Sequence, residues 1–247
     1  MMETIDTQKL RCFLGLEEDI AECYFYLPSF VGPVAMKTVP TFTTDGSLSV
    51  PKPSYLYPGN TFADHDVKAA SYILSVLSFA VGLDHIHWEY TSSFAPERSG
   101  TSFLFGSRSN QAVEWVTREA ALGKFFQFQF GDIWSIRCAN SQIFNLPDPS
   151  KLNREEYEEQ TDYGVIGRFY EKCSNSHIFL VAGLGNRATE GCGYYLSKNW
   201  MELAQKFRDN DFGVVLRFPP PINPKEFEEI LELKDDYSSG LSVDLPD

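Results

Sequence analysis

The spacing of hydrophobic positions along this chain changes between two periods, and the longer period marks the expected helices. Over 63–82, apolar residues such as Val67, Ala70, Ile73 and Leu77 recur every three or four positions, which places them on one face of a helix. Similar stripes, or a capping residue before a polar–apolar run, predict helices at 63–82, 110–122, 189–207 and 223–233.

Short apolar or alternating runs mark the expected strands. The run TSFLFGS is apolar at its centre, as in a buried strand, whereas 125–130 and 133–138 alternate and are joined by Gly131 and Asp132, a hairpin signal. The stretch 17–27 fits a helix or a strand equally well. Strands are expected at 9–16, 84–90, 101–107, 125–130, 133–138, 163–170, 177–183 and 212–218, the runs 163–170 and 177–183 forming a second hairpin.

Polar and proline-rich stretches separate these elements. Residues 31–60, rich in Pro and Thr, predict a long surface loop of the kind that often covers a binding site. Residues 151–160 are polar and acidic, and they fit a solvated helix or a loop. No repeat and no linker divides the chain, so we expect a single ligand-binding domain over 1–233, followed by a disordered tail at 234–247.

The order of these elements predicts an α/β fold. Helices and strands alternate at both ends of the chain, and hairpins lie between them. This order predicts a mixed, partly parallel sheet with helices on its faces, Rossmann-like in its parallel part, with the hairpins as insertions. Ligands of such sheets bind beyond the carboxyl ends of the strands. The turns that follow buried strands are therefore the first candidates for a site.

The charge balance narrows the partners that we expect. The chain has 247 residues and is 43% hydrophobic, enough for a core, but its formal net charge is −13 and no basic run stands out. Nucleic acid polymers and anionic membranes are held mainly by clustered Lys and Arg, so neither is expected as a partner. A small anion is compatible with this charge, because backbone N–H groups and one Arg suffice to hold it. The sequence leaves open whether a second copy or an effector chain also binds.

Cysteine usage and the lack of export signals indicate a cytoplasmic protein. The cysteines are odd in number, widely spaced and without a C-x-x-C pair, which is typical of reduced thiols and not of a disulfide framework. No apolar run reaches the length of a membrane span, and residues 1–9 lack the apolar core of a signal peptide. The cysteines are Cys12, Cys23, Cys138, Cys173 and Cys192.

The first candidate site follows the strand 101–107. The sequence FLFGSRSN leads from a buried strand through Gly106 into a helix, and Arg108 supplies a fixed positive charge. Glycine lets the backbone approach a ligand closely, and the start of a helix presents unpaired N–H groups. The alternative is that Ser109 or Asn110 only caps the helix. The candidate ligand-binding residues here are Gly106, Ser107, Arg108, Ser109 and Asn110.

The second candidate site follows the strand 177–183. The sequence FLVAGLGNRATEGCG again leads through glycines into a helix, but its spacing matches neither the dinucleotide fingerprint G-x-G-x-x-G nor the P-loop. Gly191 and Gly193 weaken a helix by about 1 kcal/mol each, so their presence indicates that a ligand or the sheet comes close. The alternative is a tight turn with helix–sheet packing. The candidate ligand-binding residues here are Gly183, Gly185, Asn186, Arg187 and Thr189.

Three acidic residues are candidates for acid–base catalysis: Asp162, Glu190 and Glu89. Asp162 directly precedes an expected strand, where an acid can anchor a ribose, act as a base or only cap a turn. Glu190 lies beside the second glycine turn, where the helix dipole alone favours an acid. No Ser-His-Asp order, H-E-x-x-H or reactive-cysteine context is present, and whether a cofactor binds is unknown from the sequence.

A further polar pattern raises the question of a metal. His85, His87 and Glu89 alternate along an expected strand, so their side chains share one face, as three metal ligands would. We expect no metal, because no additional Cys or His pair accompanies them. Whether this face lines a pocket is open. The opposite face, expected to pack in the core, consists of Ile86, Trp88 and Tyr90.

The combination FLFGSRSN, DYGVI and FLVAGLGNRATEG resembles a pattern in uncharacterised bacterial α/β domains, which are Rossmann-like. In those domains a G-x-x-x-N turn is followed by D-Y-G and then by a G-x-x-x-x-G-T-x-x-A turn. The similarity spans 102–203, and this chain has Ala188 where the pattern carries glycine. The resemblance implies a bacterial cytosolic protein, a sensor or regulatory module, and carries no established activity.

Three functions fit these observations. The first is a binding module whose glycine turns hold a nucleotide or a phosphorylated metabolite, with Arg108 and Arg187 as charge partners. The second is an enzyme that hydrolyses nucleotides or cleaves glycosidic bonds with Asp162, Glu190 or Glu89 as acid or base. The third is an interaction domain whose turns only pack. The absence of a nucleophile or a metal set favours the first function over the second.

Overall fold

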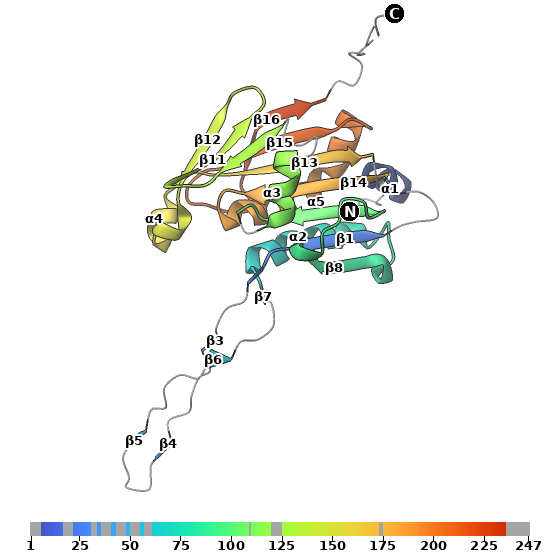
Figure 1. The fold of residues 1–247 in the computed structure, drawn as a ribbon. Helices are drawn as coiled ribbons and strands as arrows, with labels where there is room; N and C mark the ends of the chain where they lie inside the picture. The colour runs from blue at the N-terminus through green and yellow to red at the C-terminus, as the bar shows by residue number, and fades with distance from the viewer. Residues whose placement is uncertain are drawn as a thin grey trace, which may run out of the picture.

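A computed structural model shows a central seven-stranded sheet (Figure 1). It describes residues 6–16, 22–30, 34–35, 41–42, 48–49, 55–56, 61–108, 110–119, 125–172 and 175–235. The strands of the sheet are β1 (Cys23–Leu27), β8 (Ile86–Tyr90), β9 (Thr101–Phe105), β13 (Asp162–Glu171), β14 (Ser176–Gly183), β15 (Phe212–Phe218) and β16 (Glu228–Lys234). Their order across the sheet is β16-β15-β13-β14-β9-β1-β8.

The sheet is mixed, and its parallel part positions the candidate site. The pairs β8–β1, β1–β9 and β9–β14 are parallel, whereas the pairs β14–β13, β13–β15 and β15–β16 are antiparallel. The hairpin of β13 and β14 is the one that the sequence predicts. The predicted α/β class and the mixed, partly parallel sheet are therefore confirmed.

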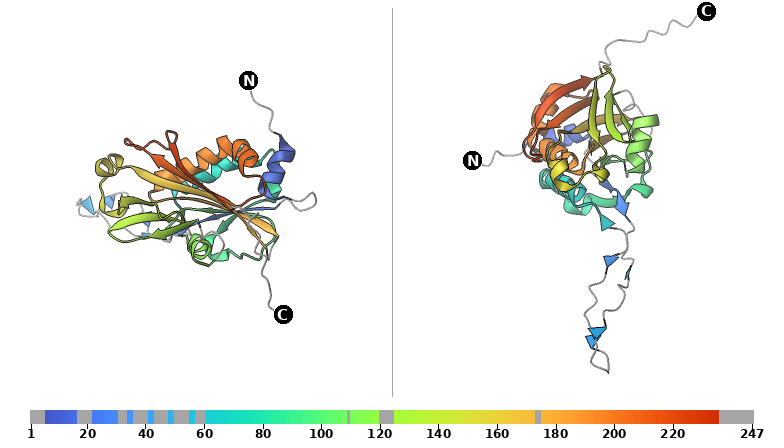
Figure 2. Two further views of the ribbon diagram at one scale, coloured as in Figure 1. Left: turned by 90° about the horizontal axis from the view of Figure 1, so that it is seen from above. Right: turned by 90° about the vertical axis from the view of Figure 1, so that its left-hand side faces the viewer.

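Each face of the sheet carries a layer of its own (Figures 1 and 2). Helices α1 (Thr7–Leu14), α2 (Asp64–Leu77) and α5 (Asn186–Phe207) cover one face and form an apolar cluster with it. The other face packs against α3 (Gln111–Glu119) and a three-stranded sheet of β10 (Phe126–Gln129), β11 (Ile133–Cys138) and β12 (Ile143–Pro147). The core thus consists of two apolar clusters, one on each side of the large sheet.

The small sheet contains the predicted hairpin and one more strand. β10 and β11 pair antiparallel across residues 130–132, as their alternation predicts, and β12 adds to the free side of β11. The polar segment 151–160 contains a short helix, α4 (Arg154–Glu158), with a capping box between Asn153 and Glu156. The exposed side chains of this helix fit the solvated helix that was one of the two alternatives.

The prediction of a first strand at 9–16 is wrong, because this segment forms α1. Leu10, Phe13 and Leu14 are buried at a spacing of three and four residues, the period of a helix. Asp6 caps the start by accepting a hydrogen bond from the N–H of Lys9, and Gly15 ends the helix in the left-handed conformation. The sequence prediction relied on the apolar residues of this segment and did not consider Asp6 and Gly15 as helix caps.

The prediction of a helix at 223–233 is also wrong. Asn223 caps only a turn, its side chain accepting a hydrogen bond from the N–H of Lys225 at 3.1 Å. The following residues form β16, which pairs antiparallel with β15 at the edge of the sheet. Ile230, Leu231 and Leu233 pack against the cluster on the α3 side, so tertiary packing outweighs the local helix signal.

Much of the predicted loop 31–60 lies outside the described residues. The prediction that this loop covers a binding site concerns those same residues. The described parts form short antiparallel pairs. They are β2 (Ser29–Phe30) with β7 (Thr61–Phe62), β3 (Val34–Ala35) with β6 (Tyr55–Leu56), and β4 (Thr41–Phe42) with β5 (Leu48–Ser49). Residues 236–247 of the expected tail are not described, whereas Lys234 belongs to β16.

The described cysteines are unpaired. Cys12 is exposed, and Cys23, Cys138 and Cys192 are buried free thiols, whereas Cys173 lies outside the described residues. Burial raises the pKa of the Cys23 thiol to about 12, so this thiol is protonated at neutral pH. Across the described ranges, no helix combines the length and the apolar composition that crossing a membrane requires.

Candidate functional site

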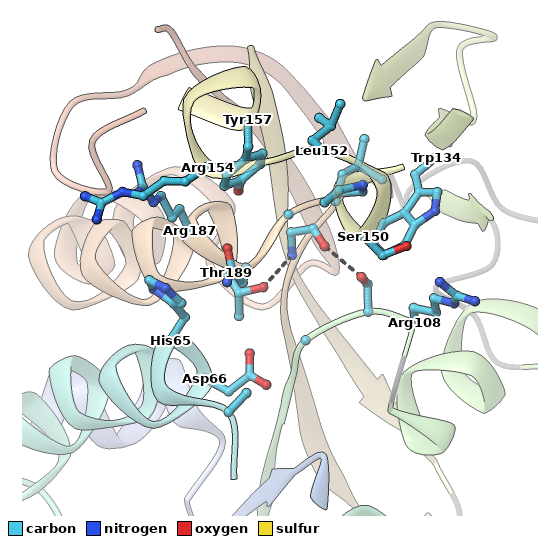
Figure 3. Close-up of a pocket in the computed structure, with 18 of the residues that line it drawn as sticks. His65, Asp66, Arg108, Trp134, Ser150, Leu152, Arg154, Tyr157, Arg187 and Thr189 are labelled. Carbon is cyan, nitrogen blue, oxygen red and sulfur yellow. Dashed lines mark hydrogen bonds between the residues drawn. The ribbon is translucent and has the colours of Figure 1, made fainter. Parts of the chain in front are cut away.

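The two glycine-bearing turns lie side by side at the carboxyl edge of the sheet. They follow β9 and β14, which are neighbouring parallel strands. The N–H of Gly106 donates to the carbonyl of Val181 at 3.1 Å, and the hydroxyl of Ser107 donates to the carbonyl of Gly183 at 2.7 Å. Thr189 closes the second turn, because its hydroxyl accepts from the N–H of Gly183 at 3.0 Å (Figure 3).

The first turn needs its glycine and uses Asn110 as a cap. Gly106 has a φ of +79°, in the left-handed region that favours glycine. Asn110 is fully buried, and its side-chain oxygen accepts from the N–H groups of Ala112 and Val113 at the start of α3. Asn110 therefore has the capping role that was the alternative to ligand contact. Ser109 lies outside the described residues.

Asp162 holds the second turn in place. Its fully buried carboxylate accepts hydrogen bonds from the hydroxyl of Tyr157 at 2.6 Å, the N–H of Tyr163 at 2.7 Å and the N–H of Gly185 at 3.0 Å. A Cβ at Gly185 would collide with the hydroxyl of Tyr157 and with the carboxylate of Asp162. The hydrogen bonds of Asp162 thus fix the position of the second turn.

A cavity of about 780 Å³ opens over both turns (Figure 3). Its walls come from the first turn of α2, from the two glycine turns, from Trp134 of β11 and from residues 149–157. Five of the candidate ligand-binding residues on the second turn line it: Gly183, Gly185, Asn186, Arg187 and Thr189. From the first turn, Gly106, Ser107 and Arg108 line it.

Two arginines on one side of the cavity share a carboxylate. Arg187 donates to the carbonyl of Ile222 at 3.1 Å and to the carboxylate of Glu158 at 2.7 Å, so both of its terminal nitrogens have acceptors within the protein. Arg154 donates to the same oxygen of Glu158 at 2.9 Å, and its side chain is 84% exposed. The pair carries one positive charge more than Glu158 neutralises. No pattern in the sequence indicated Arg154.

Arg108 is the least committed of the arginines that line the cavity. It is exposed, and its guanidinium lies 5.2 Å from the centre of the Trp134 ring. A guanidinium over an aromatic face keeps its N–H groups free for other acceptors. The sequence predicts Arg108 as a charge partner. It gives no indication that Trp134 lies at a site, because Trp134 is only one residue of an alternating strand.

The start of α5 adds partial positive charge to the same cavity. Gly185 is the N-cap residue and has no side chain to cap the helix. The first N–H groups of a helix lack partners within it, and the aligned peptide dipoles favour an anion there. Asn186, the first residue of α5, is exposed and lines the cavity. The glycines further along pack instead, since Gly191 lies against Phe218 and Gly193 against Ala69.

One acid at the cavity was missed from the sequence. Asp66, in the first turn of α2, is 5% exposed and points into the cavity (Figure 3). Burial alone raises the pKa of this carboxyl to about 7, and within the described chain no residue donates a hydrogen bond to it. An acid at this helix position ordinarily bonds the N-cap N–H, so the sequence DHDV gave no reason to separate Asp66 from Asp64.

The other two catalytic candidates are paired elsewhere. Glu190 of α5 lies 2.6 Å from the ring nitrogen Nδ1 of His65 and 3.8 Å from the amine of Lys68. His65 lines the cavity, whereas Glu190 does not. Glu89 of β8 accepts from Arg98 at 3.2 Å and does not line the cavity either. The structure thus brings neither acid to the cavity surface.

The polar face of β8 is used within the protein. His85 and His87 lie 2.8 and 2.5 Å from the two carboxylate oxygens of Glu22. Among the described residues, no three His, Cys, Asp or Glu side chains are grouped as metal ligands. The prediction that Trp88 and Tyr90 face the core is wrong, since they are 43% and 41% exposed. They lie on the edge strand of the sheet, where the covering layers end.

The three motifs of the sequence meet at the second turn. Ser107 of the first motif bonds to Gly183, and Asp162 of D-Y-G bonds to Gly185. No protein-family model, curated protein or solved structure matches this chain. Its function is therefore argued from the cavity and the side chains that line it.

Proposed function

We propose that the cavity binds a small phosphorylated ligand, with a nucleotide as the leading candidate, and that the protein is a sensor or regulatory module. The observation that carries this proposal is the start of α5, where Asn186 and Arg187 line the cavity, together with Arg108 and Arg154 in other parts of the same cavity wall. Helix N-termini and guanidinium groups are the groups that most often bind phosphate in proteins.

The size and lining of the cavity support this proposal. Small-molecule sites commonly measure roughly 300–1,000 Å³, and this cavity measures about 780 Å³. The Trp134 ring and the Arg108 guanidinium that lies over it are flat groups on which a base can stack. A ligand with a phosphate at one end and a flat ring at the other suits both features.

The environment of the acids favours binding over catalysis. Asp162 is saturated with donors, Glu190 pairs with His65, and Glu89 lies outside the cavity. A general acid or base needs to reach the substrate within hydrogen-bond distance. The hypothesis of a hydrolase that uses these acids therefore has no geometric support.

Titration calorimetry with ATP, AMP and inorganic phosphate tests the proposal. We expect the wild type to bind at least one nucleotide, and Arg108→Ala to weaken that binding about tenfold or more, since a hydrogen bond to a charged group contributes about 1.5–3 kcal/mol. The matched control is Arg217→Ala, because Arg217 lies on β15, pairs with Glu228 and is not part of the cavity wall. No binding of any of these ligands by the wild type, or equal losses in both variants, would contradict the proposal.

A further inference from the structure

Asp66 differs from every other buried acid of the site in having no donor within the described protein. Asp162 is fully buried and accepts hydrogen bonds from Tyr157, Tyr163 and Gly185, whereas Asp66 is 5% exposed and accepts none from the residues that the structure describes. Burying a carboxylate without partners destabilises a protein, and such groups are retained mainly where they act on something else. Its environment therefore requires an explanation beyond folding.

The surroundings of Asp66 keep it open on the cavity side. A Cβ at Gly106 would lie 3.3 Å from one carboxylate oxygen and 3.5 Å from the other, so the glycine leaves space beside the acid that a side chain would fill. The carboxyl group points into the cavity, on the opposite side from Arg154 and Tyr157 (Figure 3). A molecule in the cavity would thus meet cationic groups at one end and a carboxyl group at the other.

The chemistry of this acid restricts the part of the ligand that it faces. A carboxylate offers two oxygens in one plane and accepts only, so it pairs best with two neighbouring donors. A nucleotide presents such a pair in two places, the 2′,3′-diol of the ribose and the N1–H and N2–H edge of guanine. Both are neutral donors, and both are separated from the phosphate within the same molecule.

We propose that Asp66 accepts hydrogen bonds from a pair of neighbouring donors on the cavity ligand, while the phosphate of the same ligand lies at the start of α5. This inference rests on the proposed function and extends it, because it assigns the cavity two chemically different ends. Asp66 is then a specificity-determining residue that selects ligands with a paired donor.

The test compares two variants of neighbouring acids on the same helix. Asp66→Asn removes the charge at nearly unchanged volume and replaces one acceptor by a donor. Asp64→Asn is the matched control, because the Asp64 side chain is 73% exposed and pairs with Lys68 outside the cavity. Far-UV circular dichroism and melting temperature establish that both variants fold.

Binding of ATP, GTP, 2′,3′-dideoxy-ATP and ITP is then measured by calorimetry for the wild type and both variants. If the ribose diol is the partner, Asp66→Asn weakens ATP and GTP binding about tenfold or more and leaves dideoxy-ATP binding nearly unchanged. If the guanine edge is the partner, the loss is confined to GTP, and ITP, which lacks the N2 amino group, binds the wild type weakly. Asp64→Asn is expected to match the wild type with every ligand.

The inference fails in each of the following cases. Equal affinity of wild type and Asp66→Asn for ATP and GTP would show that the acid does not meet the ligand. A loss that disappears in EDTA would show that Asp66 acts through a metal ion on the phosphates. Nucleotide binding that depends on Arg108 but not on Asp66 overturns this inference alone, whereas failure of the wild type to bind any nucleotide overturns the proposed function as well.

Discussion

At the scale of single residues, the partners of a buried charge decide what that charge does. Asp162 is surrounded by donors and fixes the second glycine turn, whereas Asp66 meets none among the described residues and faces a cavity. The first arrangement stabilises the fold, and the second destabilises it as long as the cavity is empty. Functional sites commonly carry such a local penalty.

Asp66→Asn is therefore expected to stabilise the ligand-free protein at alkaline pH. The unfolded chain loses the Asp66 proton near the ordinary pKa of 3.8, and the folded protein loses it at about 7. Well below the unfolded pKa both states are neutral at this position, and between that pKa and about 7 the folded state increasingly bears the penalty. The advantage of Asn should be about 1 kcal/mol at pH 4.5 and about 4 kcal/mol at pH 8.

Urea unfolding at the two pH values measures this difference, with Asp64→Asn as the exposed control. An Asp66→Asn variant that is less stable than the wild type at pH 8 would mean that the native carboxylate is held by donors, and the assignment of an unsatisfied acid would fail.

A second residue-scale prediction concerns Arg168, which is 1% exposed at the other end of the sheet. Its guanidinium donates to the carbonyls of Phe13 at 3.2 Å and Asn210 at 2.7 Å, and also to that of Arg208. It thereby ties α1 and the end of α5 to β13. Arg168→Met leaves these carbonyls without their donor, and we expect a loss of about 3–5 kcal/mol in unfolding free energy.

The control for Arg168 is Arg217→Met, which removes an exposed ion pair and should change stability by less than about 1 kcal/mol. Chemical denaturation of both variants decides the point. Similar, small losses in the two variants would show that the buried arginine does not hold these elements together.

At the scale of elements, the packing of α2 against α5 sets the shape of the cavity wall. A Cβ at Gly193 would lie 2.5 Å from the Cα of Ala69 and 2.6 Å from its carbonyl oxygen. The two helices thus approach so closely that only glycine fits between them. Because α2 carries Asp66 and α5 carries the helix start, this contact positions the two ends of the site relative to each other.

Gly193→Ala is expected to destabilise the protein by about 1–3 kcal/mol through overpacking, although alanine is normally the better helix former by about 1 kcal/mol. Gly82→Ala is the control, since the nearest atom to its added Cβ is Cδ2 of His85 at 3.5 Å. Thermal unfolding of both variants tests this. An unchanged or raised melting temperature for Gly193→Ala would mean that the helix contact is looser than described.

The elements differ in how far the sequence predicts them. The two hairpins and α5 were predictable because alternation and the glycine turns agree with the tertiary structure. The segment 9–16 was not, because an eight-residue apolar run fits a helix and a strand alike. For β16, the Asn223 cap signal belongs to a turn, and only pairing with β15 defines the strand.

The candidate site was predictable in its backbone and not in its chemistry. The glycine turns identify the cavity because glycine marks close backbone approach, and parallel strands bring such turns to one edge. Asp66, Arg154 and Trp134 come from three other elements, and no local pattern links them. Their convergence depends on how α2, α4 and the small sheet pack, which a single sequence does not reveal.

At the scale of the whole molecule, the net charge of the chain is negative, whereas the cavity wall carries positively charged groups. The net charge is −13, yet three arginines and a helix start line the cavity. A compact anion that enters the cavity meets local positive charge, whereas a long polyanion also meets the net negative charge of the rest of the protein. We therefore expect small ligands to bind in preference to nucleic acid polymers.

We accordingly expect no retention of DNA or RNA at 150 mM salt, roughly physiological ionic strength. A filter-binding or gel-shift titration measures this, and micromolar affinity for a polymer would contradict the expectation. Nucleotide monomers in the same buffer serve as the comparison. They carry phosphate but are too short to extend from the cavity over the rest of the negatively charged protein.

Native mass spectrometry of the freshly purified protein, before and after addition of nucleotide, tests most directly whether the cavity binds a phosphorylated ligand. We predict that the wild type carries or takes up one phosphorylated small molecule per chain, and that Arg108→Ala retains less of it than Arg217→Ala. A wild type that appears only at its bare mass after exposure to millimolar nucleotide would contradict the assignment of the cavity as a phosphate-ligand site.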